Sequence, residues 1–211
     1  MEDLVQSNGS HKTTLYTAKD LIGKGGKFII LSVKDSLVFC REKFSEEQKM
    51  IGKSAIDFAT EQIRPVSTIL NTTLDEKLTR KIFSQMGDLG FLGVDVPEEF
   101  GGIELDKTTS AIVVDCLSSG ESASMMVTAS AHTGIATLPI IWYGTKKQKE
   151  KYLPKMSSGE FMGCFALTEP GAGSDVLSAS TKAELDNDKK HYILNGQKIY
   201  ITNGSWADVC I

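Results

Sequence analysis

The stretch that decides the fold reads Cys164-Phe165-Ala166-Leu167-Thr168-Glu169-Pro170-Gly171-Ala172-Gly173-Ser174-Asp175. An apolar run, Phe161 to Leu167, passes directly into a loop rich in glycine and hydroxyl side chains, so a strand followed by a turn is expected. Backbone N–H groups of such a turn, with the hydroxyls of Thr168 and Ser174, form a row of donors suited to a phosphate or an electron-rich heterocycle. A strand-ending loop merely capped by Ser and Thr has the same composition, so both interpretations stand at this point.

Strand-like segments continue downstream of this loop. The segment Tyr192-Ile193-Leu194-Asn195-Gly196-Gln197-Lys198-Ile199-Tyr200-Ile201 has an Asn-Gly pair between two strand-like runs, which predicts a type I′ hairpin at Asn195-Gly196. Residues 207–211 enter a further strand without a turn or cap to end it. An antiparallel sheet needs more strands to cover its buried face, so we expect this β domain to be incomplete and the sequence to be a fragment.

Upstream, the periodicity is helical. Capping-box patterns at Ser45-Glu46-Glu47-Gln48 and Thr145-Lys146-Lys147-Gln148 predict one helix ending near Arg64-Pro65 and a short one ending near Tyr152, before Pro154. Three further segments are predicted to be helical: an apolar stripe from Leu74 to Met86, a helix capped by Asp106 that contains Ile112, Val113, Cys116 and Leu117, and a mostly buried helix or broken helix from Ala123 to Tyr143.

These patterns predict an α+β chain, with an all-α helical domain followed by the start of an antiparallel β domain. The expected parts are an N-terminal arm at 1–44, a helical domain at 45–160 and a partial, barrel-like middle domain at 161–211. The arm has one short β-branched run, Phe28 to Val33.

Composition excludes several classes of function. The formal net charge of −4 offers no extended positive field, so nucleic-acid binding is not expected. The four cysteines, at 40, 116, 164 and 210, have neither Cys-x-x-Cys spacing nor nearby histidines, so no metal site and no disulfide framework are expected. The acidic start and the absence of a long apolar span predict a cytoplasmic protein without a membrane span, and give no support to a mitochondrial matrix location.

Two motifs carry a family resemblance. The runs Thr168-Glu169-Pro170-Gly171-Ala172-Gly173-Ser174-Asp175 and Asn195-Gly196-Gln197-Lys198-Ile199-Tyr200-Ile201-Thr202-Asn203-Gly204 resemble, in order and separation, the two flavin-binding motifs of the acyl-CoA dehydrogenase family. Residues 144–154 are similar to the family's connection into its β domain. The resemblance covers residue 45 to the end, and the N-terminal arm is similar to that of the longer bacterial, very-long-chain-like members.

The resemblance implies FAD as the cofactor. Thr168 and neighbouring backbone N–H groups would serve the pyrimidine edge of the flavin, and Thr202 would approach N5. Two positions depart from the family pattern, with Phe165 where many members have Tyr and Tyr200 where many have Trp; both keep an aromatic face. The implied cofactor-binding residues are Phe165, Ala166, Leu167, Thr168, Gly171, Gly173, Ser174, Tyr200, Ile201 and Thr202.

The resemblance also implies which residues contact the substrate, and that the catalytic base lies outside this chain. Ser174 would contact the CoA portion, while Ala131 and Ile135 belong to the region that lines the acyl pocket in relatives. The family's base is a glutamate from a C-terminal helical domain, so no catalytic residue is expected in this chain and the base is expected beyond Ile211. His132 is interpreted as a hydrogen-bonded core histidine and Glu169 as a residue that fixes the backbone.

The implied reaction is dehydrogenation of acyl-CoA thioesters at the α and β carbons to trans-2-enoyl-CoA, as in fatty acid β-oxidation. An electron-transfer flavoprotein would accept the electrons, and the full-length protein would be a homo-oligomer. The alternatives are a flavin oxidase or monooxygenase of the same fold, or a non-catalytic module in which these 211 residues act by binding alone.

Overall fold

A computed structural model describes residues 3–6, 12–16 and 40–211. The chain divides into two compact units, Met1–Glu47 and Gln48–Ile211. In the first unit, β1 (Asp3–Gln6) pairs antiparallel with β2 (Lys12–Leu15), and the short 3₁₀ turn η3 (Arg41–Lys43) follows. The run predicted as a strand at 28–33 lies outside the described residues.

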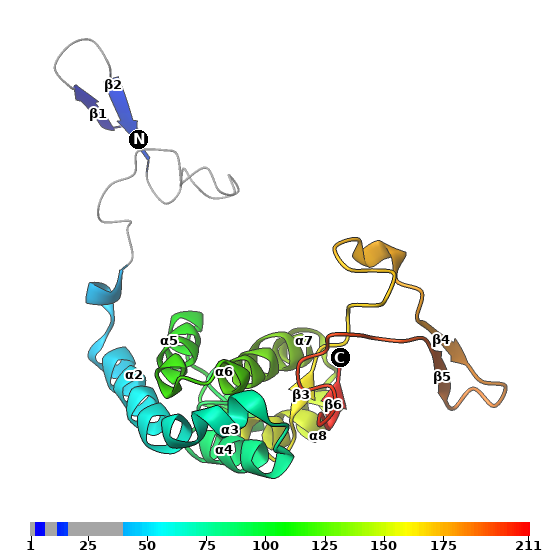
Figure 1. Cartoon of the computed structure of the whole chain (residues 1–211). Helices are drawn as coiled ribbons and strands as arrows, with labels where there is room; N and C mark the ends of the chain where they lie inside the picture. The colour runs from blue at the N-terminus through cyan, green and yellow to red at the C-terminus, as the bar shows by residue number, and fades with distance from the viewer. Residues whose placement is uncertain (1–2, 7–11, 17–39) are drawn as a thin grey trace. The chain divides into compact units, whose positions relative to one another are not determined.

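Helices make up most of the rest (Figure 1). In chain order they are α2 (Glu46–Phe58), the π-helical turn η4 (Ala59–Ile63), the 3₁₀ turn η5 (Arg64–Val66), α3 (Ser67–Thr72), α4 (Glu76–Asp88), the 3₁₀ turn η6 (Glu98–Phe100), α5 (Lys107–Leu117), the 3₁₀ turn η7 (Ser118–Gly120), α6 (Ala123–Ser130), the π-helical turn η8 (Ala131–Ala136), α7 (Thr137–Tyr143) and α8 (Lys146–Ser157). The segments after α8 hold β3 (Gly163–Cys164), the 3₁₀ turn η9 (Val176–Ser178), β4 (Lys182–Leu185), β5 (Tyr192–Asn195) and β6 (Val209–Cys210).

The predicted helix starts are confirmed at the residues that cap them. The Asp106 carboxylate accepts a hydrogen bond from Thr109 N at 2.7 Å, and Thr145 and Gln148 form a reciprocal capping box at the start of α8. Each cap satisfies backbone N–H groups that the helix itself leaves unpaired. These local side-chain contacts fix where α5 and α8 begin.

One predicted helix end is confirmed and one was wrong. The helical run that begins with α2 ends with η4 at Ile63, beside Arg64-Pro65, and the separate turn η5 leads into α3, whose Leu70 is buried. The last helix does not stop near Tyr152, because α8 continues through Pro154 to Ser157. The buried side chains of Leu153 and Met156 hold this final turn against the core, and that packing offsets the hydrogen bond that proline cannot donate.

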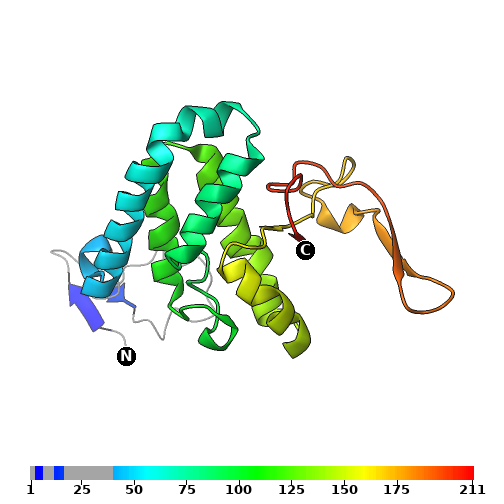
Figure 2. The same ribbon diagram turned by 90° about the horizontal axis from the view of Figure 1, so that it is seen from below.

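The helices enclose one large hydrophobic cluster and a smaller one. The larger cluster joins α2, α4, α5 and α6, with Ile63, Phe83, Met86 and Leu92 almost fully buried at its centre. The smaller cluster brings Ile140 of α7 and Leu153 of α8 together with Val209 of β6. Figure 2 shows these helices packed side by side as a bundle. The small cluster thus joins helices to a strand inside the compact unit Gln48–Ile211.

The run from Ala123 to Tyr143 is the most apolar helical segment that the structure describes. Its length and mean hydropathy are those of a membrane span, but half of it is buried inside the protein. Met125, Ala129 and His132 face the core, whereas Trp142 and Tyr143 are exposed. It is therefore a core helix, broken by η8 and less buried than its composition predicts.

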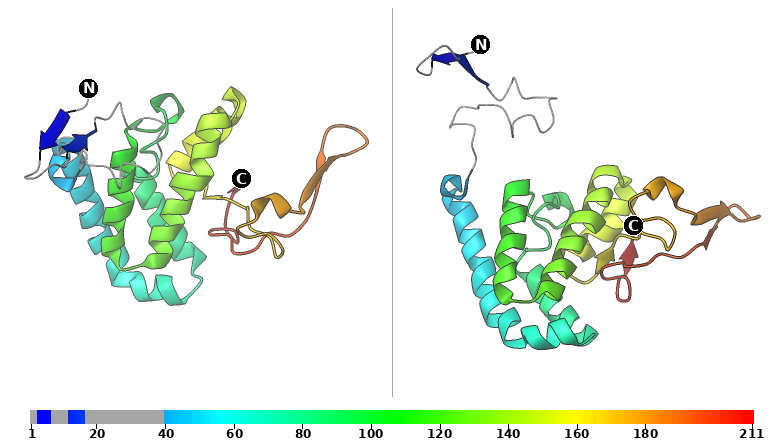
Figure 3. Two further views of the ribbon diagram at one scale, coloured as in Figure 1. Left: turned by 90° about the horizontal axis from the view of Figure 1, so that it is seen from above. Right: turned by 45° about the horizontal axis from the view of Figure 1, so that its top comes forward.

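The strands pair in an order that differs from the predicted hairpin. β4 and β5 form an antiparallel hairpin that projects from the helices (Figure 3), and its turn lies at 186–191, not at Asn195-Gly196. The Asp186 carboxylate closes the turn by accepting from Lys190 N and His191 N, and Lys189 takes φ +59°. Gly196 serves a close backbone approach instead, because an added Cβ would lie 2.2 Å from Thr181 Oγ1.

The predicted final strand is present as β6, but its partner is β3 and the pair is parallel. Only Gly163 and Cys164 of the apolar run 161–167 form a strand. A parallel pair needs a long crossover between its strands, and here the crossover includes the hairpin and both motif segments.

His132 fixes the junction between the helices and β3. Its side chain is fully buried; Nε2–H donates to Met156 O at 3.0 Å, and Nδ1 accepts from Gly163 N at 3.0 Å. The ring of Phe83 meets it edge-on, with centroids 4.8 Å apart. Burial lowers the pKa of His132 to about 4, so the imidazole is neutral at pH 7.

Replacing Leu92 by Ala is expected to destabilise the fold by about 2–5 kcal/mol, because it opens a cavity in the larger cluster. The matched Leu74→Ala variant removes the same atoms from a side chain that is 89% exposed, and it is expected to change stability by less than about 0.5 kcal/mol. Urea unfolding followed by circular dichroism measures both. Equal losses in the two variants would contradict the core described above.

The free energy of unfolding is also expected to decrease as the pH is lowered, because His132 is buried in its neutral form. The native pKa of about 4 lies below the value of 6.5 for an unperturbed histidine, so between these values the unfolded chain binds a proton that the folded chain excludes. The free energy of unfolding should therefore drop by about 2 kcal/mol from pH 7 to pH 5 on account of this group.

His132→Gln should remove that part of the pH dependence, whereas His191→Gln, at a side chain that is 75% exposed, should leave it in place. Urea unfolding at pH 7 and pH 5 distinguishes the two. An unchanged slope in His132→Gln would rule out a neutral buried imidazole.

Candidate functional site

The glycine-rich loop after β3 is a tight turn with an open rim. Glu169 and Ala172 exchange two backbone hydrogen bonds, of 3.0 and 3.1 Å, around Pro170-Gly171. A Cβ added to Gly171 or Gly173 would meet no atom within 4 Å. The N–H groups of both glycines have no hydrogen-bond partner within residues 40–211, so this turn presents backbone donors to its surroundings.

The buried side chain of Glu169 connects the loop to residues 180–181 and to Lys198. Its carboxylate accepts from Ser180 N at 2.6 Å, Ser180 Oγ at 2.9 Å and Thr181 N at 3.0 Å. Lys198 Nζ pairs with the same carboxylate at 2.8 Å, and this contact foremost holds the pKa of Glu169 far below its ordinary value. The predicted backbone-fixing role of Glu169 agrees with these contacts.

The second motif lies directly against the first. Ile199 N donates to Thr168 O at 2.9 Å, and Lys198 Nζ reaches Leu167 O at 3.0 Å in addition to Glu169. Tyr200 follows with φ +56°, a left-handed conformation that a bulky residue seldom adopts, and its side chain is 91% exposed. The structure thus brings together two segments that are about 30 residues apart in the sequence.

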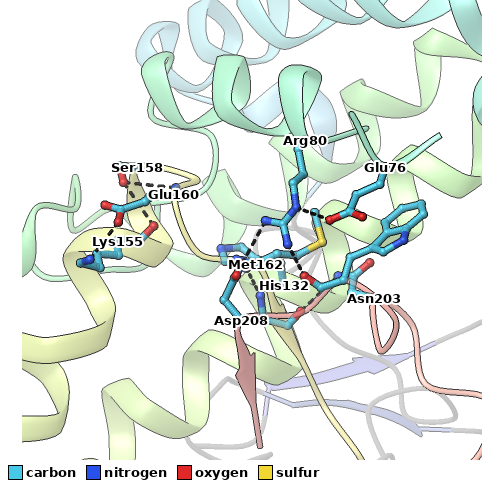
Figure 4. Close-up of polar contacts among 11 residues, drawn as sticks. Glu76, Arg80, His132, Lys155, Ser158, Glu160, Met162, Asn203 and Asp208 are labelled. Atoms are coloured by element: carbon cyan, nitrogen blue, oxygen red, sulfur yellow. Dashed lines mark hydrogen bonds and ion pairs between the residues drawn. The ribbon is translucent and has the colours of Figure 1, made fainter. Parts of the chain in front are cut away.

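A second set of contacts fastens the chain after Thr202 to the helices (Figure 4). Arg80 of α4 pairs with Glu76 at 2.8 Å and with Asp208 at 3.1 Å, and it donates to Trp206 O. Asp208 also accepts from Met162 N at 2.9 Å. The side-chain amide of Asn203 donates to Thr128 O and to Gly163 O, both at 3.1 Å. These contacts fix the course of residues 203–208.

A pocket opens between this segment and the helices. It measures about 240 Å³, and apolar side chains of Leu70, Met125 and Trp206 line it together with hydroxyl groups of Thr128 and Thr202. Ile201 and Thr202 are the only predicted cofactor-binding residues in its wall; Thr168, Ser174 and Tyr200 are not part of it.

The other predicted site residues spread over several environments. Phe165, Ala166 and Thr168 are half-buried, while Leu167, Gly171, Gly173 and Ser174 are exposed. Of the predicted substrate-binding residues, Ala131 is buried in η8 and Ile135 is 53% exposed on it. No backbone hydrogen bond joins either of them to Ser174 among residues 40–211, and their roles in binding the acyl group and CoA stay predictions.

Sequence reasoning missed Arg80, Lys198, Asn203 and Asp208. Arg80 lies 128 residues from Asp208, and no local pattern marks such a pair. Lys198 and Asn203 lie within the second motif, but their residue types alone did not predict their contacts with Glu169, Thr128 and Gly163. The signal that could have marked them is a charged side chain and a side-chain amide on either side of the apolar run Ile199-Tyr200-Ile201.

The comparisons with known proteins agree along the whole of the second unit. The model of the acyl-CoA dehydrogenase N-terminal domain matches residues 45–160, and that of the acyl-CoA dehydrogenase middle domain matches residues 164–211. A probable acyl-CoA dehydrogenase of Bacillus subtilis is 41% identical over 90% of this chain and 32% of its own length. The very long-chain specific acyl-CoA dehydrogenase of Macaca fascicularis is 32% identical over 98% of this chain and 32% of its own length.

A solved structure shows the same fold. The chain is similar to the crystal structure of an acyl-CoA dehydrogenase complexed with FAD from Bacillus anthracis, with a TM-score of 0.84 and 43% identity over 89% of this chain and 32% of that one. The sequence therefore spans about a third of the length of these three relatives. On the match of the N-terminal domain model to more than half of its residues, the chain belongs to the acyl-CoA dehydrogenase family.

Proposed function

We propose that this chain supplies the loop side of an FAD and acyl-CoA site in an acyl-CoA dehydrogenase that forms trans-2-enoyl-CoA. The single observation that carries the proposal is the joining of the two motifs by Thr168 O, Ile199 N and the Glu169–Lys198 ion pair. The FAD-bound relative from Bacillus anthracis, at 43% identity, supports the choice of cofactor.

The residues present fit a flavin. The open N–H groups of Gly171 and Gly173 and the half-buried Thr168 offer donors to the electron-rich edge of a heterocycle, and Tyr200 offers an exposed aromatic face. The half-buried Thr202, in the second motif, adds a second hydroxyl group. An anionic phosphate also suits such donors, so the pyrophosphate of FAD and the phosphates of CoA are both compatible with the turn.

When bound, FAD supplies hydride-accepting chemistry. The part of this chain would be to orient the cofactor and to place fixed donors where negative charge develops, since preorganised dipoles stabilise such charge without moving. Glu169 contributes indirectly, because its carboxylate is committed to Ser180, Thr181 and Lys198 and cannot abstract a proton from a substrate. His132 is equally committed, with both ring nitrogens bonded.

The wider setting forms part of the same proposal. Within fatty acid β-oxidation, the reduced cofactor would pass electrons to an electron-transfer flavoprotein, and the whole protein would be a homo-oligomer. The four cysteines without a disulfide are compatible with a cytoplasmic location.

A chimera tests the proposal directly. Residues 45–211 would replace the matching part of the Bacillus subtilis relative, and the purified protein would be examined for flavin absorbance and for bleaching by a series of acyl-CoA thioesters. Stoichiometric FAD and bleaching by at least one thioester are the expected results. The unmodified relative, purified in the same way, is the control: a folded chimera without flavin beside a control that carries it would overturn the proposal.

Oxygen reactivity separates the dehydrogenase from an oxidase or monooxygenase. The chimera reduced by acyl-CoA is expected to be reoxidised slowly by O₂ and rapidly by an electron-transfer flavoprotein. The reverse order would leave the FAD site standing and replace the dehydrogenase by an oxygen-using enzyme.

Removing the Glu169 carboxylate should loosen the loop without unfolding the helices. Glu169→Ala leaves Ser180 N, Thr181 N and Lys198 Nζ without their acceptor, so amide hydrogens of residues 169–181 and 198–202 should exchange faster. In the chimera the same change should weaken FAD retention. Glu184→Ala on the exposed strand β4 is the matched control, and hydrogen exchange resolved by mass spectrometry reports on both. Unchanged exchange in Glu169→Ala would show that the loop is held by other contacts.

A further inference from the structure

Two cysteines face each other across the parallel strand pair. In the register of β3 and β6, Cys164 is the direct partner of Cys210. Ile211 N donates to Cys164 O at 3.0 Å, and Ala166 N donates to Ile211 O at 2.8 Å, so the pairing continues beyond both cysteines. Paired strands lie about 4.7–4.9 Å apart, which falls within the Cα separation of about 4.4–6.8 Å that a disulfide spans.

The two thiols also lie on the same face. Directly paired residues of neighbouring parallel strands project to the same side of the sheet. Contact between the two side chains contributes, after burial, to a pKa of about 11 for Cys164. Cys164 is 3% exposed, whereas Cys210 is open to solvent. The pair therefore combines a sheltered thiol with an accessible one.

The other cysteines have no such arrangement. Cys116 lies on α5, with its nearest sequence neighbours helical, and Cys40 precedes η3 in the first unit. None of the four cysteines forms a disulfide in this structure.

We propose that Cys164 and Cys210 form a redox-active dithiol pair, which low-molecular-weight disulfides such as oxidised glutathione convert to an intramolecular disulfide. Neither the family assignment nor the proposed flavin site is needed for this inference, which stands on strand register and exposure.

The exchange proceeds in two steps. The Cys210 thiol loses its proton to solvent, and the thiolate attacks one sulfur of oxidised glutathione; a mixed disulfide forms and one glutathione thiolate leaves. Cys164 then loses its proton and attacks the Cys210 sulfur, which releases the second glutathione thiolate. The protein loses two electrons and two protons, and the oxidant becomes two molecules of glutathione.

Exposure and acidity set this order of attack. Cys210 is reachable by a dissolved disulfide, while Cys164 is enclosed and its raised pKa keeps it protonated. The second step succeeds because its partner sulfur is held beside it, which makes the reaction intramolecular. The product would link β3 covalently to β6 four residues before Thr168, where the first motif begins.

Peptide mapping under non-reducing conditions tests the proposal. The 211-residue chain is incubated with oxidised glutathione in native buffer, free thiols are alkylated, and trypsin is added. Cys164 lies in the peptide 156–182 and Cys210 in the peptide 199–211, so the disulfide appears as one cross-linked mass. The 164–210 link is expected to exceed any other pairing by at least about ten-fold, because the paired strands hold these two residues side by side.

Three controls make the outcome decisive. The Cys40→Ser/Cys116→Ser double variant should keep the cross-link, and Cys210→Ser should lose it and leave Cys164 unmodified by glutathione. In urea the preference for the 164–210 pair should disappear. A native digest with glutathione stably attached to Cys210 and no 164–210 link, or with the same mixture of pairings as in urea, would overturn the proposal. Far-UV circular dichroism of each variant before oxidation verifies that the fold is intact.

Discussion

The hydrogen bonds of the Gly163 backbone set the position of β3 and of the second motif relative to the helices. The Gly163 N–H donates to the buried imidazole of His132, and its carbonyl accepts from the side-chain amide of Asn203, so the two peptide groups of this one residue are held by η8 and by the second motif. The same residue has room for no side chain, since an added Cβ would lie 2.7 Å from Ala136 Cβ and 2.8 Å from Met156 Cε. A buried polar junction of this kind tolerates few alternatives, because each unpaired group left by a shift would cost free energy.

Two polar clusters beyond this junction are built in the same way, with one charged side chain at the centre of each. Glu169 gathers donors from three places in the chain after β3, and Arg80 gathers acceptors from α4 and from the segment that ends in Asp208. Each cluster is centred on a charged side chain that has both side-chain and backbone partners: Glu169 accepts from two backbone N–H groups, and Arg80 donates to the backbone carbonyl of Trp206. In each cluster one buried or half-buried charge joins segments that are distant in the sequence. This also explains how a chain with little regular β structure can present two motifs side by side.

Sequence reasoning was most successful where the deciding contacts are local. The caps at Asp106 and Thr145 and the apolar face of α4 are read within a few residues, and so are the motifs that carry the family resemblance. It failed where distant residues decide. Pro154 stays inside α8 because its neighbours are buried, and Asn195-Gly196 does not form the hairpin because Asp186 closes a turn elsewhere and Thr181 crowds Gly196. For the site, the loop and the role of Glu169 were predictable, whereas Arg80 and Asp208 have partners more than a hundred residues away.

Tyr200 combines a left-handed backbone with the exposed aromatic face that we propose for the flavin. Glycine would adopt φ +56° without strain, and by that measure Tyr200 is one of the least favourable residues for its own conformation. Glycine would also remove the aromatic face that this strained turn directs outward. Variants selected only for resistance to heat would therefore drift towards glycine or asparagine at position 200, and under the proposed flavin role variants selected for turnover would keep the ring. Comparing the two populations would reveal which demand has shaped this position.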